Sequence, residues 1–198
     1  MKNDSKALMD LKIDFMRFCE DHNLTGKSAY LKIMFIVDFY PVAHYRLLEF
    51  CNEKKTITRK ILKLISVLLR PLVDGLSGAR IYSDAKIDGG LLFHQSSGVV
   101  IAPGAIIGKN CTFFSGACVA YKANFGGSGA PVIGDNVKLM LGAKVIGAVK
   151  VGNDSFVGAN AVVTSDVPAY SIAVGVPAKI KPRRDVSVSE VNNLLQGE

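Results

Sequence analysis

The stretch IGDNVKLMLGAKVIGAVKVGNDSFVGANAVV, residues 133–163, places an aliphatic side chain at every sixth position. These side chains belong to Ile133, Leu139, Val145, Val151, Val157 and Val163. A period of six fits neither an α-helix, which repeats about every 3.6 residues, nor an isolated strand, which alternates about every two. It is typical of a three-sided parallel coil, in which each six-residue unit forms one side and three units complete one turn.

The same period runs through the preceding residues in two further sets. These sets are Ile81, Ile87, Phe93 and Val99, followed by Ile101, Ile107, Phe113 and Val119. In units such as VGNDSF, residues 151–156, the first residue is aliphatic and the fifth is small or β-branched, so we expect both to point into the coil. Gly, Asn or Asp often stands at the corner of a unit, where a positive φ costs these residues little. The sequence therefore predicts a mainly β fold for its second half.

Two breaks interrupt this period. Ile87 and Ile101 are fourteen residues apart instead of twelve, which indicates two added residues around HQSSG, residues 94–98. The segment YKANFGGSGAP, residues 121–131, is Gly-rich and off-register, and it predicts a loop that leaves the coil. Such loops carry function more often than the regular coils that hold them.

Residues 1–78 follow a different pattern, with apolar residues at helical spacing. The spaced positions are Leu8, Leu11, Phe15 and Phe18, then Ile57, Ile61, Leu64, Ile65, Leu68 and Leu72. We expect Pro41 and Pro71 to limit these helices and DGLSG, residues 74–78, to link them to the coil. The predicted division is an α-helical N-terminal domain at 1–78, a β-helical domain at 79–182 and a C-terminal tail at 183–198.

The segment TRKILKLISVLLR, residues 58–70, is both basic and apolar, and it allows two interpretations. Its apolar face packs on neighbouring helices while Lys60, Lys63 and Arg70 stay in solvent, or the helix lies on a membrane surface. A membrane crossing is not expected, because Lys63 and Arg70 interrupt an apolar run that is shorter than the about 20 residues a bilayer needs.

Composition excludes several other classes of function. With 49% hydrophobic residues among 198, the chain can bury a sizeable core. The net charge of +7 would suit a phosphate-bearing partner, but no block of five like charges occurs, so a nucleic-acid partner is not expected.

The start of the chain lacks a secretory pattern and its cysteines form no C-x-x-C pair, which together favour the cytoplasm. No His, Cys and carboxylate set has zinc spacing, so no metal is expected, and Cys111 and Cys118 are interpreted as core residues.

Several motifs together resemble one acyltransferase family. They are AKIDGG, GVVI, GGSGAPVIGDN, LGAKVIG, VGANAVVTSDVP and VGVPAKI, and they extend over about residues 80–182. This part of the chain resembles the serine acetyltransferase-like acyltransferases, including relatives found in polysaccharide and capsule gene clusters. The resemblance implies a left-handed parallel β-helix, acetyl-CoA as co-substrate, and a homotrimer with active sites between subunits.

His94 is the predicted catalytic residue. Acyl transfer to a hydroxyl needs a base, and a histidine of near-neutral pKa suits this role. In the family, the base follows the first break of the coil and precedes a run like GVVI, which is where His94 stands. An alignment without gaps, however, puts the family histidine on Gln95 and puts His94 where serine acetyltransferases hold an aspartate. A slip of one residue turns a strand side chain to the other face, so a bulge within 94–98 restores its direction, or Gln95 has replaced the base. A histidine that only fills a corner is the third interpretation.

The acceptor side departs from the serine acetyltransferases. Arg80 corresponds to their acidic partner, and Ala130 corresponds to a histidine of theirs. We therefore expect a hydroxyl of a sugar or polysaccharide precursor as acceptor, bound by Gln95 and Arg80. Serine O-acetyltransferase is the alternative enzyme. A catalytically silent binding or scaffold protein is the alternative from another class, and the slipped histidine and the bulky Met140-Leu141 pair favour it.

The donor side matches the family more closely. The resemblance implies that the pantetheine arm of acetyl-CoA lies along Gly and Ala positions on the outside of the coils, where backbone is accessible. The matching residues are Gly127, Ser128, Gly142, Ala143, Gly158 and Ala159. Lys179, after the closing GVP motif, is expected to meet the phosphates of coenzyme A.

Overall fold

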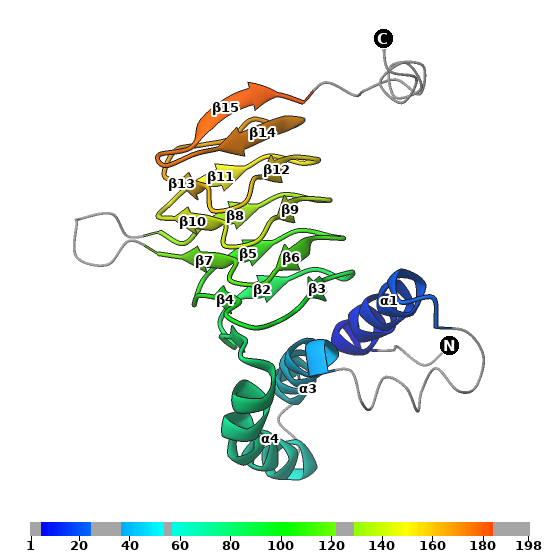
Figure 1. Cartoon of the computed structure of the whole chain (residues 1–198). Helices are drawn as coiled ribbons and strands as arrows, with labels where there is room; N and C mark the ends of the chain where they lie inside the picture. The colour runs from blue at the N-terminus through cyan, green and yellow to red at the C-terminus, as the bar shows by residue number, and fades with distance from the viewer. Residues whose placement is uncertain (1–4, 25–36, 54–56, 122–128, 184–198) are drawn as a thin grey trace.

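The computed structural model describes residues 5–24, 37–53, 57–121 and 129–183. Helices gather at one end of a stacked β coil (Figure 1). The helical elements are α1 (Lys6–Asp21), the short 3-10 helix η1 (Val37–Phe39), α3 (Tyr40–Glu53) and α4 (Ile57–Ser77). The fold is a parallel β-helix with an α-helical N-terminal part, as the sequence predicts.

Fifteen short strands make up the three sides of the coil within the described residues. They are β1 (Arg80–Ile81), β2 (Lys86–Ile87), β3 (Leu92–His94), β4 (Val100–Ile101), β5 (Ile106–Ile107), β6 (Thr112–Phe114), β7 (Cys118–Ala120), β8 (Val132–Ile133), β9 (Lys138–Leu139), β10 (Lys144–Ile146), β11 (Lys150–Val151), β12 (Phe156–Val157), β13 (Val162–Val163), β14 (Ser171–Val174) and β15 (Lys179–Pro182). The three sheets have the orders β1-β4-β7-β10-β13, β11-β8-β5-β2 and β15-β14-β12-β9-β6-β3. All neighbours pair in parallel except β14 and β15, which are antiparallel.

The strand register confirms the first break in the period. Phe93 pairs with Phe113, whereas Ile101 pairs with Val119. Phe93 and its partner are therefore separated by two more residues in the sequence than Ile101 and its partner. These two extra residues fall in segment 95–97, at one corner of the coil.

The coil interior has the composition that the repeat predicts. First and fifth residues of the units fill it, such as Ile107 and Cys111, and both are fully buried. Most corners with positive φ are occupied by Gly, Asn or Asp, among them Asn110, Asn136, Asp154 and Asn160, while Gln95 and Tyr170 are exceptions. Burial raises the pKa of the Cys111 thiol to about 12, as expected of a core residue that does no chemistry.

Cys118 does not share this environment, so its assignment to the core is wrong. It is the sixth residue of its unit, one position after the inward-facing Ala117, and therefore faces outward. Its register partner Lys144 is exposed, and Cys118 itself is half-buried. Desolvation nevertheless raises the pKa of its thiol.

A buried arginine fastens the helices to the first turn of the coil. Arg46 of α3 is bonded through Nε to Asp14 Oδ2 of α1 at 2.8 Å. Its two Nη atoms donate to the carbonyls of Ile87 and Asp88 at 2.7 and 2.8 Å. Asp14 Oδ1 accepts the N–H groups of residues 90–91 at 2.6 and 2.8 Å. Burial raises the pKa of the Asp14 carboxyl, and Arg46 opposes this shift.

The helix boundaries differ from those predicted. Pro71 lies inside α4, which continues through Gly75 to Ser77, so Pro71 does not end the helix and segment 74–78 is mostly helical. Pro41 is the second residue of α3, where a missing backbone N–H leaves no helical hydrogen bond unmade. The chain turns into the coil at Gly78, which has a φ of 66°.

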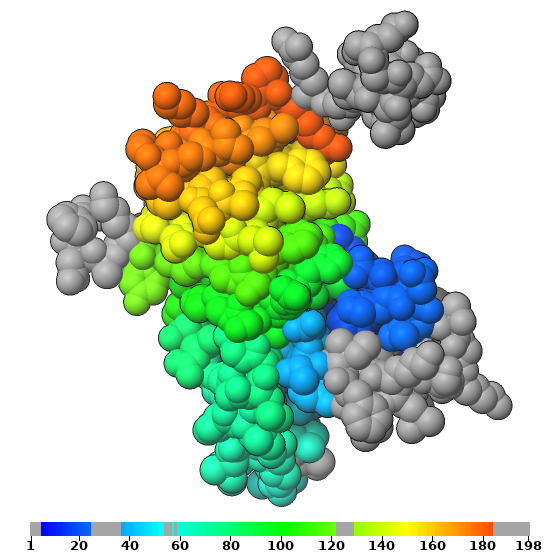
Figure 2. All heavy atoms as spheres, in the orientation of Figure 1, coloured from blue at the N-terminus to red at the C-terminus, as the bar shows by residue number. Residues whose placement is uncertain are grey.

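The apolar face of α4 does not pack on neighbouring helices, and that interpretation is wrong. Figure 2 shows α4 standing out at the end of the molecule opposite β15. The exposed large residues on it are Ile57, Ile61, Leu64, Ile65, Val67, Leu68, Leu69, Leu72 and Leu76. Its polar side faces α3 instead, since Arg59 donates to the Phe50 carbonyl and Lys63 donates to Asn52 Oδ1. Within the described ranges, no helix combines the length and the apolarity that a membrane crossing needs.

Candidate functional site

His94 lies on the outer face of β3. Phe93 points into the coil and Leu92 packs under α1, while the His94 side chain remains 33% exposed. The imidazole stacks on Phe114 of the next turn, with ring centres 4.7 Å apart and planes 18° apart. Its Nε2 lies 3.4 Å from Oδ1 of Asp21, the last residue of α1. The histidine is therefore held from two sides and still accessible.

A hollow of about 380 Å³ surrounds this histidine. Its lining residues are Arg17, Glu20, Asp21, Leu92, His94, Thr112, Phe114 and Lys138. The hollow, called here the His94 pocket, thus joins the C-terminal end of α1 to the outer face of β3, β6 and β9. It brings two cations, two carboxylates and an imidazole together.

The charged groups of the His94 pocket differ in whether they already have partners within the protein. Arg17 is committed to the coil, since it donates to the carbonyls of Gly90 and Cys111 and to Thr112 Oγ1, the last at 2.8 Å. Glu20 is exposed, and Lys138 has no carboxylate partner within the described part of the chain. The Lys138 ammonium lies 5.4 Å from the centre of the Phe156 ring. Lys138 and Glu20 are therefore the groups available to a charged ligand.

Asp21 is the residue that sequence reasoning missed. It is on a helix far from His94 in the sequence, and no feature of the six-residue period points to it. Only the packing of α1 against β3 brings the carboxylate to the imidazole. A second imidazole, that of His22, places its Nδ1 3.5 Å from Asp21 Oδ2.

Gln95 occupies the corner that follows β3. It is exposed and adopts a φ of 58°. Two hydrogen bonds of the next residue fix the inserted corner. The Ser96 N–H donates to Asp38 Oδ1 at 2.6 Å, and the Ser96 hydroxyl donates to the Ser77 carbonyl at 2.9 Å. The insertion thus comes after His94, which keeps the outward direction of its strand position.

Arg80 is not brought to the His94 pocket. It belongs to β1, on another sheet of the coil, and its Nε donates to Asp74 Oδ2 at 2.9 Å. Its exposed guanidinium is therefore occupied by a carboxylate at the end of α4.

The Gly, Ala and Ser residues predicted to line the donor wall lie in different environments. Ala143 is fully buried inside the coil and cannot offer its side chain to a ligand on the outer wall, so its inclusion in that wall is wrong. Gly142 forms a corner with a φ of 68°, and Ala159 is an exposed corner residue. Gly158 is half-buried, and a Cβ there would lie 2.8 Å from Val174 Cγ1, so packing of the next turn already requires glycine. The two loop residues at 127–128 lie outside the described residues.

Lys179 is exposed at the far end of the sheet that carries His94. It is in β15, and five steps between neighbouring strands separate β15 from β3. With strands about 4.8 Å apart, the two lie roughly 24 Å from each other along the coil. A long, thin ligand would be needed to span both.

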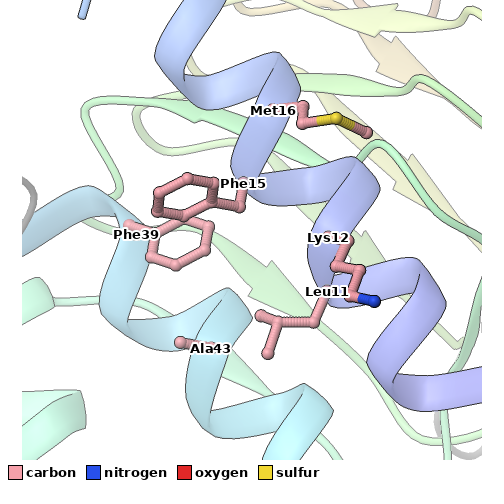
Figure 3. A pocket seen from close by; sticks show the side chains of 6 residues that line it. All are labelled: Leu11, Lys12, Phe15, Met16, Phe39 and Ala43. Carbon is pink, nitrogen blue, oxygen red and sulfur yellow. The ribbon is translucent and has the colours of Figure 1, made fainter. Parts of the chain in front are cut away.

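A second hollow, of about 540 Å³, lies between α1 and α3 (Figure 3). It is lined by Leu11, Lys12, Phe15, Met16, Phe39 and Ala43. Lys12 is the one titratable group among these lining residues, and none of them is a nucleophile or a base of near-neutral pKa. The His94 pocket, which holds an accessible imidazole beside a carboxylate, is the candidate site. No group of three His, Cys, Asp or Glu side chains suited to a metal occurs within the described ranges.

Comparison with known sequences places the chain among bacterial acetyltransferases. Residues 130–165 match the family described as bacterial transferase hexapeptide (six repeats). A serine acetyltransferase of Helicobacter pylori strain J99 is 37% identical over 144 residues, which are 71% of this chain and 81% of that protein. A serine acetyltransferase of Staphylococcus aureus strain Mu50 is 34% identical over 139 residues, or 70% of this chain. The chain spans 62% of the length of the Staphylococcus protein.

Solved structures agree with this comparison. The soybean serine acetyltransferase apoenzyme is 28% identical, with a TM-score of 0.65, over 90% of this chain and 70% of that one. The serine acetyltransferase of Neisseria gonorrhoeae has a TM-score of 0.73 over 96% of this chain and 72% of that one. Its identity of 23% makes that likeness one of fold.

Proposed function

Because the chain belongs to the serine acetyltransferase family, we propose that it transfers the acetyl group of acetyl-CoA to the hydroxyl of an amino acid, with serine as the first candidate. The main structural support for this proposal is an accessible imidazole beside a carboxylate in a small charged hollow. The relatives favour serine over the sugar acceptor expected from Arg80 and Ala130. The sequence expectation of a sugar therefore gives way to the alternative enzyme.

The size and charge of the His94 pocket support a small zwitterionic acceptor. Its volume of about 380 Å³ lies near the lower end of ligand pockets, which suits a small acceptor. We assign the acceptor carboxylate to Lys138 and the acceptor ammonium to Glu20, since opposite charges on the ligand then meet opposite charges on the protein. A neutral sugar would leave both charges without a partner. Gln95, at the rim, is assigned to a polar contact with the acceptor.

The proposed reaction is direct transfer. His94 takes the proton of the acceptor hydroxyl while that oxygen attacks the thioester carbonyl. The carbon–sulfur bond breaks, coenzyme A leaves as its thiolate, and the imidazolium returns the proton to the sulfur. No acyl-enzyme forms, which agrees with the buried Cys111 and with the raised pKa of Cys118. The donor is assigned to the outer edge of the His94 sheet, along Gly158 and Ala159 toward Lys179. We propose a homotrimer, which light scattering would report as three times the 21.2 kDa chain.

An acceptor assay tests this function. Release of free thiol from acetyl-CoA is followed with L-serine, with L-threonine, with a monosaccharide panel and with no acceptor. We expect turnover that depends on L-serine and a raised KM for L-serine in Lys138→Gln. Turnover with a sugar alone would overturn the acceptor assignment, and no turnover with any acceptor would favour a silent binding protein.

The donor assignment predicts a thermal shift that depends on Lys179. At a hundredfold excess over its Kd, acetyl-CoA should stabilise the protein by about 2.7 kcal/mol, and the Tm should rise by roughly 5–10 °C. Lys179→Gln should reduce this rise, whereas Lys150→Gln, which removes an exposed cation from another sheet, should leave it unchanged. An equal shift in both variants would remove Lys179 from the donor site.

A further inference from the structure

The two ring nitrogens of His94 have different surroundings. Nε2 faces Asp21 Oδ1 at 3.4 Å, and the ring face rests on Phe114. Nδ1 has no hydrogen-bond partner among the residues that the structure describes. One ring nitrogen thus has a carboxylate at ion-pair distance, and the other has no partner among the described residues.

Asp21 is the carboxylate that faces this nitrogen. The other charged groups around the ring are Arg17 and Glu20 on α1 and Lys138 on β9. Arg17 donates to the Cys111 carbonyl and to Thr112 Oγ1, which ties α1 to the coil about one turn before Asp21. His22 places its Nδ1 3.5 Å from the other carboxylate oxygen of Asp21. The helix that carries Asp21 is therefore held on the coil by contacts that do not involve His94.

A carboxylate beside one nitrogen of a neutral imidazole decides which nitrogen carries the proton. The proton resides on the nitrogen that can donate to the carboxylate, and the lone pair is then left on the other. The same contact stabilises the imidazolium that forms when the base accepts a proton.

We propose that Asp21 is a positioning residue that holds His94 as its Nε2–H tautomer, so that Nδ1 is the nitrogen that accepts the proton of the acceptor hydroxyl. This assignment rests on the proposed acetyl transfer. It places the orienting carboxylate on the N-terminal helix, whereas the coil position expected to hold an acidic partner is Arg80, which is engaged with Asp74. The site is then complete only when α1 is docked on the coil.

Nitrogen-15 NMR of the imidazoles tests the tautomer without any substrate. At a pH where His94 is neutral, long-range proton–nitrogen spectra of the full chain should show the proton on Nε2. His94→Gln assigns the signal by its loss. In Asp21→Asn the Nε2–H preference should weaken, and in Asp88→Asn it should persist. Asp88 is a suitable control because it also joins α1 to the coil, through Lys6 at 3.0 Å, away from the pocket. A dominant Nδ1–H form in the unaltered protein would overturn the proposal.

Kinetics supply the second readout. Asp21→Asn should lower kcat roughly tenfold to a hundredfold, less than the loss of the base itself, with the KM for acetyl-CoA unchanged. Asp21→Glu should restore part of the rate, and Asp88→Asn should keep it. An unchanged kcat in Asp21→Asn would overturn the proposal.

The two proposals fail in different ways. If the chain transfers acetyl to no acceptor, the proposed function falls while the NMR result still decides whether Asp21 sets the tautomer. If turnover is normal but the tautomer ignores Asp21, the function stands and the positioning role falls.

Discussion

His94→Ala should lower kcat with L-serine by about 10² to 10⁴, the range for removal of a general base. The residue is on the outer face of β3 and 33% exposed, so the folding cost is confined to the lost stacking on Phe114. Such aromatic contacts contribute about 0.5–1.5 kcal/mol. Turnover, Tm and the acetyl-CoA-dependent shift in Tm should be measured on the same preparation. We expect turnover to fall sharply and the acetyl-CoA-dependent shift in Tm to persist.

Gln95 provides the matched comparison for His94. Gln95→Gly removes the amide and suits the φ of 58° at this corner, so it should not destabilise the coil. Its effect on kcat should remain well below that of His94→Ala. A larger loss for Gln95→Gly than for His94→Ala would make Gln95 the important residue and return His94 to a structural role. Equal losses of activity and of Tm in His94→Ala would have the same consequence for His94.

Arg46→Ala should destabilise the chain by about 3–5 kcal/mol, the usual cost of breaking a buried ion pair from one side. The substitution leaves Asp14 buried without its cation and removes the donors of the Ile87 and Asp88 carbonyls. It also removes the contact to Glu49 Oε2 at 2.9 Å. The Tm measured by calorimetry should fall by roughly 10 °C.

A second substitution separates the charge from the lost packing. Asp14→Asn in the Arg46→Ala background should recover part of the stability, because it removes the carboxylate left without a partner. Lys6→Ala, which breaks an exposed ion pair with Asp88 between the same elements, should cost at most about 1 kcal/mol. Similar losses in Lys6→Ala and Arg46→Ala would contradict the importance of the buried network.

The coil could be predicted because its rules are local. Each unit repeats the inward positions and the corner residue, so Ile107, Cys111 and Asn110 were placed correctly from spacing alone. The two-residue insertion could be predicted because Ile87 and Ile101 are separated by fourteen residues in the sequence instead of twelve. Errors arose where a residue was one step out of phase. Cys118 and Ala143 are the examples, since alternation along a strand reverses the side on which each residue lies.

The helical half and the site were less predictable, because both depend on contacts between distant segments. Helical spacing in α4 marks an apolar face, but spacing does not say what covers that face. Pro71 is a helix breaker by propensity, yet it lies within α4. Asp21 meets His94 only because α1 docks on β3, and no local pattern in either segment encodes that meeting.

The inserted corner at 95–97 shows how the coil tolerates variation in length. Strands on both sides of it keep their partners, as Phe93 with Phe113 and Ile101 with Val119. The longer break at 121–131 behaves alike, since Val119 still pairs with Val145. Ladder hydrogen bonds join one turn to the next and none depends on the length of a corner, while the entropic cost of a longer corner grows only slowly. Corners can thus differ in length while the strands keep their register, and a graft at 95–97 that retains the contacts of Ser96 would remodel the rim of the pocket.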